Sequence, residues 1–122
     1  CIGVHLAFRV ALNKQISCAF CLYTTDLHSN TLPCQEGNDS LTRSGDIDCP
    51  MVLVFGKQDP HVSAQGRVLI YQTLSQNECD FSWHEVNAQH AFMRDEGDRY
   101  DAALAIQMYK MATDFFHSTL RL

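Results

Sequence analysis

The sequence predicts an α/β fold with about three mostly parallel strands flanked by helices. Three short segments have the composition of strands: 16–23, 51–55 and 80–86. Segments with the apolar spacing of helices precede, separate and follow them. Strands that alternate with helices form a parallel sheet with helices on its faces. This order therefore indicates one α/β domain.

Length and charge narrow the classes of partner. The chain has 122 residues, of which 46% are hydrophobic and 19% are charged, and its formal net charge is -5. This length suffices for one domain with a hydrophobic core. The acidic balance argues against a nucleic-acid partner and an anionic membrane, because both are bound by basic surfaces. The apolar run 51–55 is far shorter than the roughly 20 residues of a membrane-spanning helix.

The N-terminal part is expected to form a helix, a strand and a long loop. Apolar residues in 3–12 recur with helical spacing, and Asn13 is a suitable stop. The segment 16–23 is apolar without clean alternation, which is typical of a strand buried on both faces. The segment 24–48 is polar and rich in turn-forming residues, so we expect a loop with one short helical turn.

The middle of the chain predicts a strand followed by a helix. The run 51–55 has the character of a buried strand, and Gly and Pro residues in 56–60 end it. An amphipathic helix is expected over 63–75, with Ser63 as its N-cap. Its expected apolar positions are Val68, Leu69, Tyr71 and Leu74.

The C-terminal part predicts one more strand and one more helix. Alternation over 80–86 indicates a strand with one more polar face, and a polar loop follows over 87–98. The segment 101–120 is expected to be a long amphipathic helix. Its apolar stripe consists of Leu104, Met108, Met111, Ala112, Phe115, Phe116 and Leu120.

These elements make only part of a sheet. Three strands are few, and the strand at 16–23 would leave one edge of the sheet uncovered. The sequence also begins with Cys1 instead of Met. We therefore expect residues 1–122 to be a single partial domain whose N-terminal strands are missing. An uncovered edge would also allow self-association or pairing with the missing half.

The six cysteines favour a reducing, cytoplasmic location. An even count is compatible with a disulfide framework. Several cysteines, however, lie inside apolar segments, where cysteine behaves as a small buried hydrophobe. Cys18 and Cys21 have the spacing of a metal-binding pair, but a strand would point them to opposite faces. No second pair completes a zinc site, so we expect no metal.

Candidate catalytic residues follow two of the predicted strands. Ligands of open α/β sheets bind outside the carboxyl ends of the strands. Asp59 follows the strand at 51–55, and His90 follows the strand at 80–86. An acid followed by a histidine is the end of the α/β-hydrolase order of nucleophile, acid and histidine. Cys1-Ile2-Gly3, directly before a helix, matches the second half of a nucleophile elbow.

Several motifs carry a specific resemblance. They are Cys1-Ile-Gly-Val-His-Leu-Ala-Phe-Arg9, Tyr23-Thr-Thr-Asp-Leu-His28, Gly56-Lys-Gln-Asp-Pro-His-Val62 and Gln89-His-Ala-Phe-Met-Arg94. Together they resemble the C-terminal half of the dienelactone hydrolase (carboxymethylenebutenolidase) family, across essentially the whole chain. The resemblance implies the C-terminal part of an α/β-hydrolase fold. It also implies hydrolysis of small-molecule esters or lactones by a Cys-His-Asp triad without a cofactor.

The resemblance assigns roles residue by residue. Cys1 falls on the nucleophile, Asp59 on the acid and His90 on the base. The backbone N–H of Ile2 falls on one oxyanion donor. Tyr23 and Arg94 fall on substrate-binding positions, and an arginine suits a substrate carboxylate because its planar fork pairs with two oxygens.

Two positions depart from the family pattern. Val4 stands where the elbow has a second glycine, and Ala91 stands where a serine often follows the histidine. Both departures concern the choice of substrate more than the class of reaction.

Each assignment has a simpler alternative. Asp59 before Pro60 is a common turn pair, and His90 alone would be read as an exposed loop histidine. Arg94 and Tyr23 could serve as a solvated charge and as packing. His61 and His84 are interpreted as structural or exposed.

The alternatives extend to the whole chain. One is a truncated, inactive hydrolase remnant that acts as an interaction module. A weaker one is another α/β-hydrolase activity, such as that of a peptidase or thioesterase. A nucleophile at the end of a chain is poorly held, so we expect little turnover by these 122 residues alone.

Overall fold

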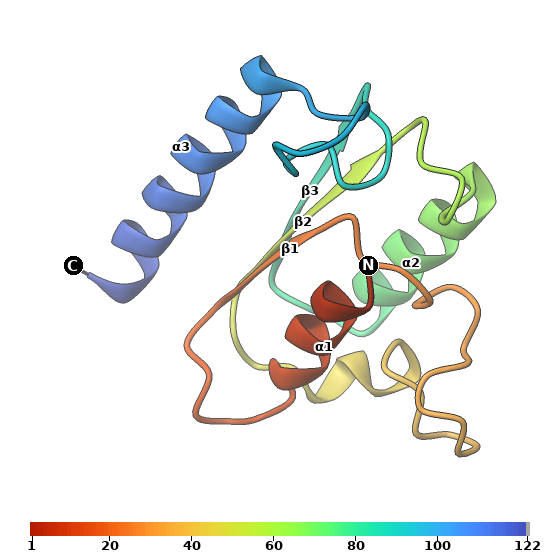
Figure 1. Ribbon diagram of the computed structural model, residues 1–122. Helices are drawn as coiled ribbons and strands as arrows, with labels where there is room; N and C mark the ends of the chain where they lie inside the picture. The colour runs from red at the N-terminus through yellow and green to blue at the C-terminus, as the bar shows by residue number, and fades with distance from the viewer. Residues whose placement is uncertain (122) are drawn as a thin grey trace.

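The structure is a computed structural model that describes residues 1–121 (Figure 1). It contains one three-stranded sheet, three α-helices and one short 3-10 helix. The elements in chain order are α1 (Ile2–Val10), β1 (Ala19–Leu22), η1 (Thr42–Asp46), β2 (Met51–Gly56), α2 (Ala64–Gln76), β3 (Phe81–Val86) and α3 (Ala102–Leu120).

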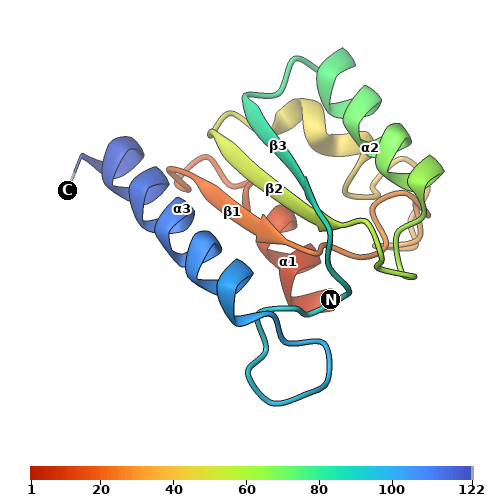
Figure 2. The same cartoon turned by 90° about the horizontal axis from the view of Figure 1, so that it is seen from above.

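The sheet is parallel throughout and has the strand order β1-β2-β3 (Figure 2). Met51 of β2 aligns with Ala19 of β1 on one side and with Phe81 of β3 on the other. This arrangement confirms the predicted α/β class. Within residues 1–121, β1 and β3 each have a single neighbouring strand, so the predicted uncovered edge at β1 is present.

Helices cover both faces of the sheet (Figures 1 and 2). Met51, Leu53 and Phe55 of β2 pack into a cluster with residues of α1 and α2, such as Phe8 and Ile70. The alternate β2 residues, Val52 and Val54, pack into a second cluster with α3 residues Leu104, Met108, Met111 and Phe115. All six residues of β2 are buried, as expected for a central strand covered on two faces.

The first strand is shorter than predicted. It spans Ala19–Leu22, whereas the sequence predicted 16–23. The backbone N–H of Ile16 instead donates to the Asn13 carbonyl, in a turn that follows α1. Phe20 is only half-buried, although its ring packs against Phe115 and Phe116. The distances between the ring centroids are 6.2 and 6.3 Å.

Helix α2 begins as predicted, because the Ser63 hydroxyl accepts a hydrogen bond from the Gly66 N–H at 3.0 Å. The prediction of its apolar face was largely wrong. Leu74 is buried together with Ile70, but three expected core residues are exposed: Val68 at 54%, Leu69 at 42% and Tyr71 at 47%. Residues 70 and 74 are one helical turn apart and face the sheet, which turns the other three outward.

Helix α3 spans nearly the predicted segment and has most of the predicted apolar stripe. The Asp101 carboxylate accepts a hydrogen bond from the Leu104 N–H at 3.0 Å. Met108 is buried, but Leu120 at the end of the stripe is 41% exposed, because the helix extends beyond the sheet there. Of the helices formed by residues 1–121, none has the length and apolar character needed to cross a membrane.

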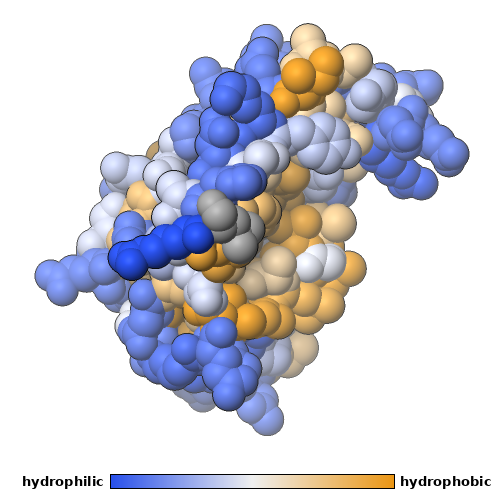
Figure 3. All heavy atoms as spheres, turned by 90° about the vertical axis from the view of Figure 1, so that its left-hand side faces the viewer, coloured by the Kyte–Doolittle hydropathy of each residue, from blue (hydrophilic) through white to orange (hydrophobic). Residues whose placement is uncertain are grey.

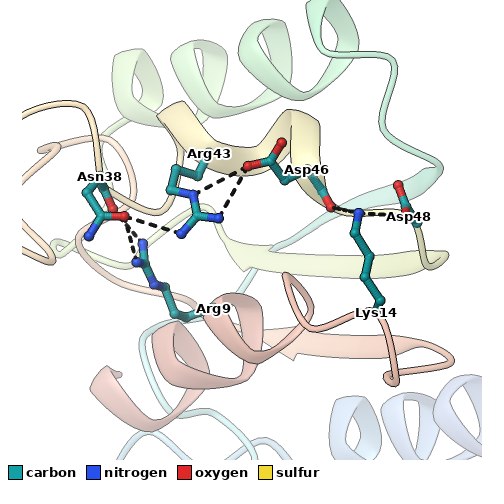
Figure 4. A network of polar contacts seen from close by, with 6 residues as sticks. All are labelled: Arg9, Lys14, Asn38, Arg43, Asp46 and Asp48. Atoms are coloured by element: carbon teal, nitrogen blue, oxygen red, sulfur yellow. Dashed lines mark hydrogen bonds and ion pairs between the residues drawn. The ribbon is translucent and has the colours of Figure 1, made fainter.

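The segment 24–48 is an ordered loop that contains η1, the predicted helical turn. Arg9 of α1 donates to the Asn38 carbonyl at 2.6 Å, and Lys14 pairs with Asp48 at 2.6 Å (Figure 4). Inside the protein, His5 is bonded through Nδ1 to the Thr25 carbonyl and through Nε2 to the Ser40 hydroxyl, both at 2.7 Å. His5 is therefore a buried anchor of the loop.

Candidate active site

The loops after β2 and β3 are joined at the carboxyl edge of the sheet. The backbone N–H groups of Lys57 and Gln58 donate to the carbonyls of Val86 and Ala88 at 2.8 and 3.0 Å. Gly56 allows this close approach, because a Cβ atom there would lie 2.3 Å from the Ala88 carbonyl oxygen. The two loops therefore hold Asp59 and His90 in a fixed relation.

Asp59 and His90 form a buried hydrogen-bonded pair. Nδ1 of His90 lies 2.7 Å from Oδ2 of Asp59, and the two residues are 4% and 7% exposed, with Asp59 the more buried. An ionised carboxylate can only accept hydrogen bonds, so the hydrogen lies on Nδ1 of His90. Nε2 of a neutral His90 is then left as a proton acceptor. The structure thus brings the two predicted residues together in the geometry of an acid–histidine pair.

A second histidine contacts the same carboxylate. The backbone N–H of His61 donates to Oδ1 of Asp59 at 2.8 Å, and its ring Nδ1 lies 2.9 Å from the same oxygen. The His61 ring lies beside that of His90, with ring centroids 4.3 Å apart. The His61 side chain is 50% exposed, in line with the prediction that it is structural or exposed, but its contact with Asp59 was not predicted. The spacing Asp-x-His was the only sequence signal for this contact.

The electrostatics favour an ionised acid and a neutral base. Burial raises the pKa of Asp59, but hydrogen bonds from the His61 backbone and from the His90 and His61 rings outweigh it, and the net pKa is lowered. Burial lowers the pKa of His90, and the opposing hydrogen bond and charge of Asp59 do not fully compensate. At neutral pH, His90 is therefore able to accept a proton.

Two residues beside the pair have left-handed backbone conformations. Tyr23 at the end of β1 has φ 44°, and Ala91 directly after His90 has φ 58°. Such values are uncommon for residues other than glycine and are concentrated at functional sites. The Tyr23 ring meets the His90 ring edge-on at 5.3 Å. Tyr23 is therefore in the site, and its ring contacts the predicted base.

The beginning of the chain reaches the same corner. The amino group of Cys1 donates to the Tyr23 carbonyl at 2.7 Å, and Cys1 is exposed. Burial lowers the pKa of this amino group, while the charges of Asp59 and Asp26 raise it. Cys1 is the N-cap of α1, and within residues 1–121 the Ile2 N–H has no hydrogen-bond partner.

Within residues 1–121, the Arg94 side chain is not bonded to the other residues of the site. Its backbone N–H donates to the Ala91 carbonyl at 3.0 Å, and its side chain is exposed. In the part of the chain that the structure describes, the guanidinium makes no hydrogen bond or ion pair.

Three side chains of the site have donor atoms of the kind that bind metals. One ligand atom each from Asp59, His61 and His90 lies within 4.8 Å of the others. In the structure these atoms are joined directly by the two imidazole–carboxylate hydrogen bonds. The arrangement present is thus a hydrogen-bonded cluster, and proton transfer is the chemistry it can perform without a metal.

Comparison with known proteins agrees with this geometry. Residues 1–120 match the model of the dienelactone hydrolase family. The chain belongs to the dienelactone hydrolase family. The match covers nearly all of the sequence, so the predicted resemblance is confirmed, and with it membership of a family of hydrolases.

A curated relative supports the family assignment, and two solved structures share the fold. The chain is 41% identical to the "Putative carboxymethylenebutenolidase" of Saccharomyces cerevisiae, over its full length and 47% of the relative. It therefore spans about half the length of this relative. The fold also matches the "Putative Dienelactone Hydrolase" of Klebsiella pneumoniae, with TM-score 0.84 and 19% identity, over 95% of this chain and 48% of the other.

The second structure is a dienelactone hydrolase-like promiscuous phosphotriesterase from metagenomic libraries. It matches with TM-score 0.76 and 17% identity, over 98% of this chain and 49% of the other. At this low identity, both structural matches establish the fold alone. They agree with the predicted α/β-hydrolase architecture. In each case this chain corresponds to about half of the length of the solved structure.

Proposed function

We propose that this chain contributes a Cys-His-Asp triad to a hydrolase that cleaves carboxylic esters or lactones. The single observation that supports it most is the buried hydrogen bond between Asp59 and His90, at 2.7 Å. The carboxylate fixes the tautomer of the imidazole, stabilises the imidazolium that forms when the base takes a proton, and leaves Nε2 available.

In the proposed reaction, His90 takes the proton of the Cys1 thiol. The thiolate then attacks the substrate carbonyl, forming a carbon–sulfur bond and a tetrahedral oxyanion. The unpaired N–H of Ile2 at the start of α1 is a suitable donor to that oxyanion, and the positive end of the helix favours negative charge there. His90 gives the proton to the alkoxide, which leaves as its bond to the carbonyl carbon breaks, so that a thioester on Cys1 remains. Water deprotonated by His90 then attacks this thioester, the carbon–sulfur bond breaks, and the proton returns to the Cys1 sulfur as the acid product leaves.

Tyr23 and Arg94 complete the proposed site as substrate-binding residues. Tyr23 is supported by the contact of its ring with His90. Arg94 lies on the same loop as His90, where its exposed guanidinium is free to meet a substrate carboxylate. The proposed chemistry uses only side chains, a backbone N–H and water. A cytoplasmic location is proposed with it, because nucleophilic thiols persist in reducing compartments.

The proposal can be tested in a chimera of the Saccharomyces relative, in which this chain replaces the matched segment. Hydrolysis of p-nitrophenyl acetate is compared among the chimera, Cys1→Ser, Asp59→Asn and His90→Ala, with the unmodified relative as the reference. We expect each variant to lose at least about a hundredfold in kcat. Equal rates in the chimera and all three variants would remove the triad assignment.

A second candidate function is an inactive interaction module. It is favoured by the uncovered edge of β1 and by an exposed apolar row on α1: Ile2 at 53%, Leu6 at 57% and Val10 at 51%. Apolar side chains also gather over the side that α3 and the β1 edge present (Figure 3). Such surfaces favour pairing with another chain. Sedimentation of the 122-residue chain, alone and mixed with the unmatched half of the relative, distinguishes self-association from pairing.

A further inference from the structure

We infer that His61 is a positioning residue of the hydrolytic site, which acts by holding the Asp59 carboxylate so that its other oxygen is fixed on His90. The inference rests on the proposed triad. It adds a member that the triad does not contain.

The two oxygens of the Asp59 carboxylate have different hydrogen-bond partners. Among residues 1–121, Oδ2 of Asp59 accepts only from the His90 ring, at 2.7 Å, whereas Oδ1 accepts from the backbone N–H and the ring of His61, at 2.8 and 2.9 Å. A carboxylate held on one oxygen alone could rotate about its bond to Cβ. Donors on both oxygens oppose that rotation, so the His61 contacts stabilise the orientation that His90 needs.

The Asp59 carboxylate is buried. Asp59 is 4% exposed, so water has little access to an oxygen that loses its protein donor. An unsatisfied buried acceptor carries a large desolvation penalty. Loss of the His61 ring would leave Oδ1 with the His61 backbone N–H but without its second donor. This partial loss would favour rotation of the carboxylate or entry of water, and either change loosens its hold on His90.

The rings of His61 and His90 lie beside each other. The His61 and His90 centroids are 4.3 Å apart with an angle of 41° between the rings, and Tyr23 contacts His90 from 5.3 Å. His90 thus has aromatic neighbours as well as a carboxylate that fixes its Nδ1. Because half of the His61 side chain faces solvent, a structural role in the core does not account for its position.

The test separates the His61 ring from its backbone. His61→Ala removes the ring contact with Oδ1 but keeps the backbone N–H, whereas His61→Asn retains a side-chain N–H at the position of the ring Nδ1. His117→Ala, on an exposed position of α3, is the matched control. The side-chain nitrogen and proton resonances of His90 are measured by NMR in the 122-residue chain.

In the wild-type chain and the control, we expect a single His90 tautomer with a slowly exchanging Nδ1 proton. His61→Ala should broaden that proton signal and mix the tautomers, and His61→Asn should restore the sharp signal and the single tautomer. An unchanged His90 signature in His61→Ala would overturn the inference, whether or not the chain hydrolyses any substrate. Failure of the triad itself would appear separately, as undiminished hydrolysis by Cys1→Ser and His90→Ala.

Kinetics in the chimera give a second readout. A hydrogen bond to a charged group corresponds to roughly a ten- to hundredfold change in rate, so we expect His61→Ala to lower kcat by about that factor with little change in KM. His61→Asn should recover most of the loss in kcat. A fall confined to KM would contradict a positioning role and would instead assign His61 to substrate binding.

Discussion

Gly56 and Ala88 approach each other backbone to backbone, so that a Cβ atom on Gly56 would lie 2.3 Å from the Ala88 carbonyl oxygen. This contact joins the ends of β2 and β3 and lies directly before the two loops that hold Asp59 and His90. The distance between the acid and the base therefore depends on Gly56, whose carbonyl also accepts a hydrogen bond from the Asp59 backbone N–H at 3.1 Å.

Replacement of Gly56 by alanine should separate the two loops. The added methyl group meets backbone atoms that cannot move without displacing β3, so we expect a loss of about 1–3 kcal/mol in the free energy of unfolding. Urea denaturation measures this loss, and His90 NMR measures the displacement. Gly45→Ala is the control, because its Cβ would make only ordinary contacts at 3.7 Å. Equal stability of the two variants would contradict the prediction.

Asp59→Asn tests the function of the carboxylate without changing its shape. The amide has no negative charge to stabilise the imidazolium and can present N–H groups to His90, which favours the wrong tautomer. We expect kcat in the chimera to fall by about 10³–10⁴-fold. Asp95→Asn, on an exposed position of the loop after His90, should leave it unchanged. A residual rate above one-tenth in Asp59→Asn would show that the carboxylate is dispensable.

Stability should decrease as the solution becomes acidic. The pKa of His90 is lowered by burial from its ordinary value of 6.5, so the unfolded chain binds a proton more readily than the folded one. The contribution of His90 is complete above pH 6.5 and is lost as the pH falls from there towards the folded pKa. The pKa of Asp59 is lowered from 3.8, which removes further stability at still lower pH.

The measurement is the urea midpoint between about pH 5 and pH 8. We expect a lower midpoint at the acidic end in the wild type, and a flatter dependence in His90→Gln. His117→Gln should retain the wild-type slope. A wild-type midpoint that rises with increasing acidity would contradict this direction.

The cysteines should differ sharply in their reactivity. Burial raises the pKa of the Cys21 thiol to about 12, helped by the neighbouring Cys49, so almost no thiolate is present at neutral pH. Cys1 and Cys34 are exposed. We expect iodoacetamide to modify Cys1 and Cys34 rapidly and Cys21 only after unfolding, as followed by peptide mass spectrometry. Early modification of Cys21 in the native chain would contradict this order.

Arg94 makes a prediction about substrate charge. If its guanidinium holds a substrate carboxylate, Arg94→Ala in the chimera should raise KM roughly tenfold for an ester that carries a carboxylate, as expected for a lost charge-assisted hydrogen bond. The same variant should leave KM for neutral p-nitrophenyl acetate unchanged. Arg99→Ala, on the same exposed segment, is the control. Equal effects on both esters would remove Arg94 from the site.

The class of fold and the acid–histidine pair could both be predicted from the sequence. Apolar periodicity is a local property, so the order of helices and strands could be read from it. The carboxyl ends of parallel strands meet at one edge, which placed Asp59 and His90 in neighbouring loops. Motif spacing then indicated the family.

Which other side chains contact one another within this fold depends on the tertiary structure and could not be predicted from the sequence. It turned Val68, Leu69 and Tyr71 outward, because the face of a helix that packs depends on the sheet beneath it. It left Arg94 exposed and brought His61 to the second oxygen of Asp59. Such contacts depend on rotamers and on loop conformations with positive φ, as at Tyr23, and these are selected by packing and not by residue spacing.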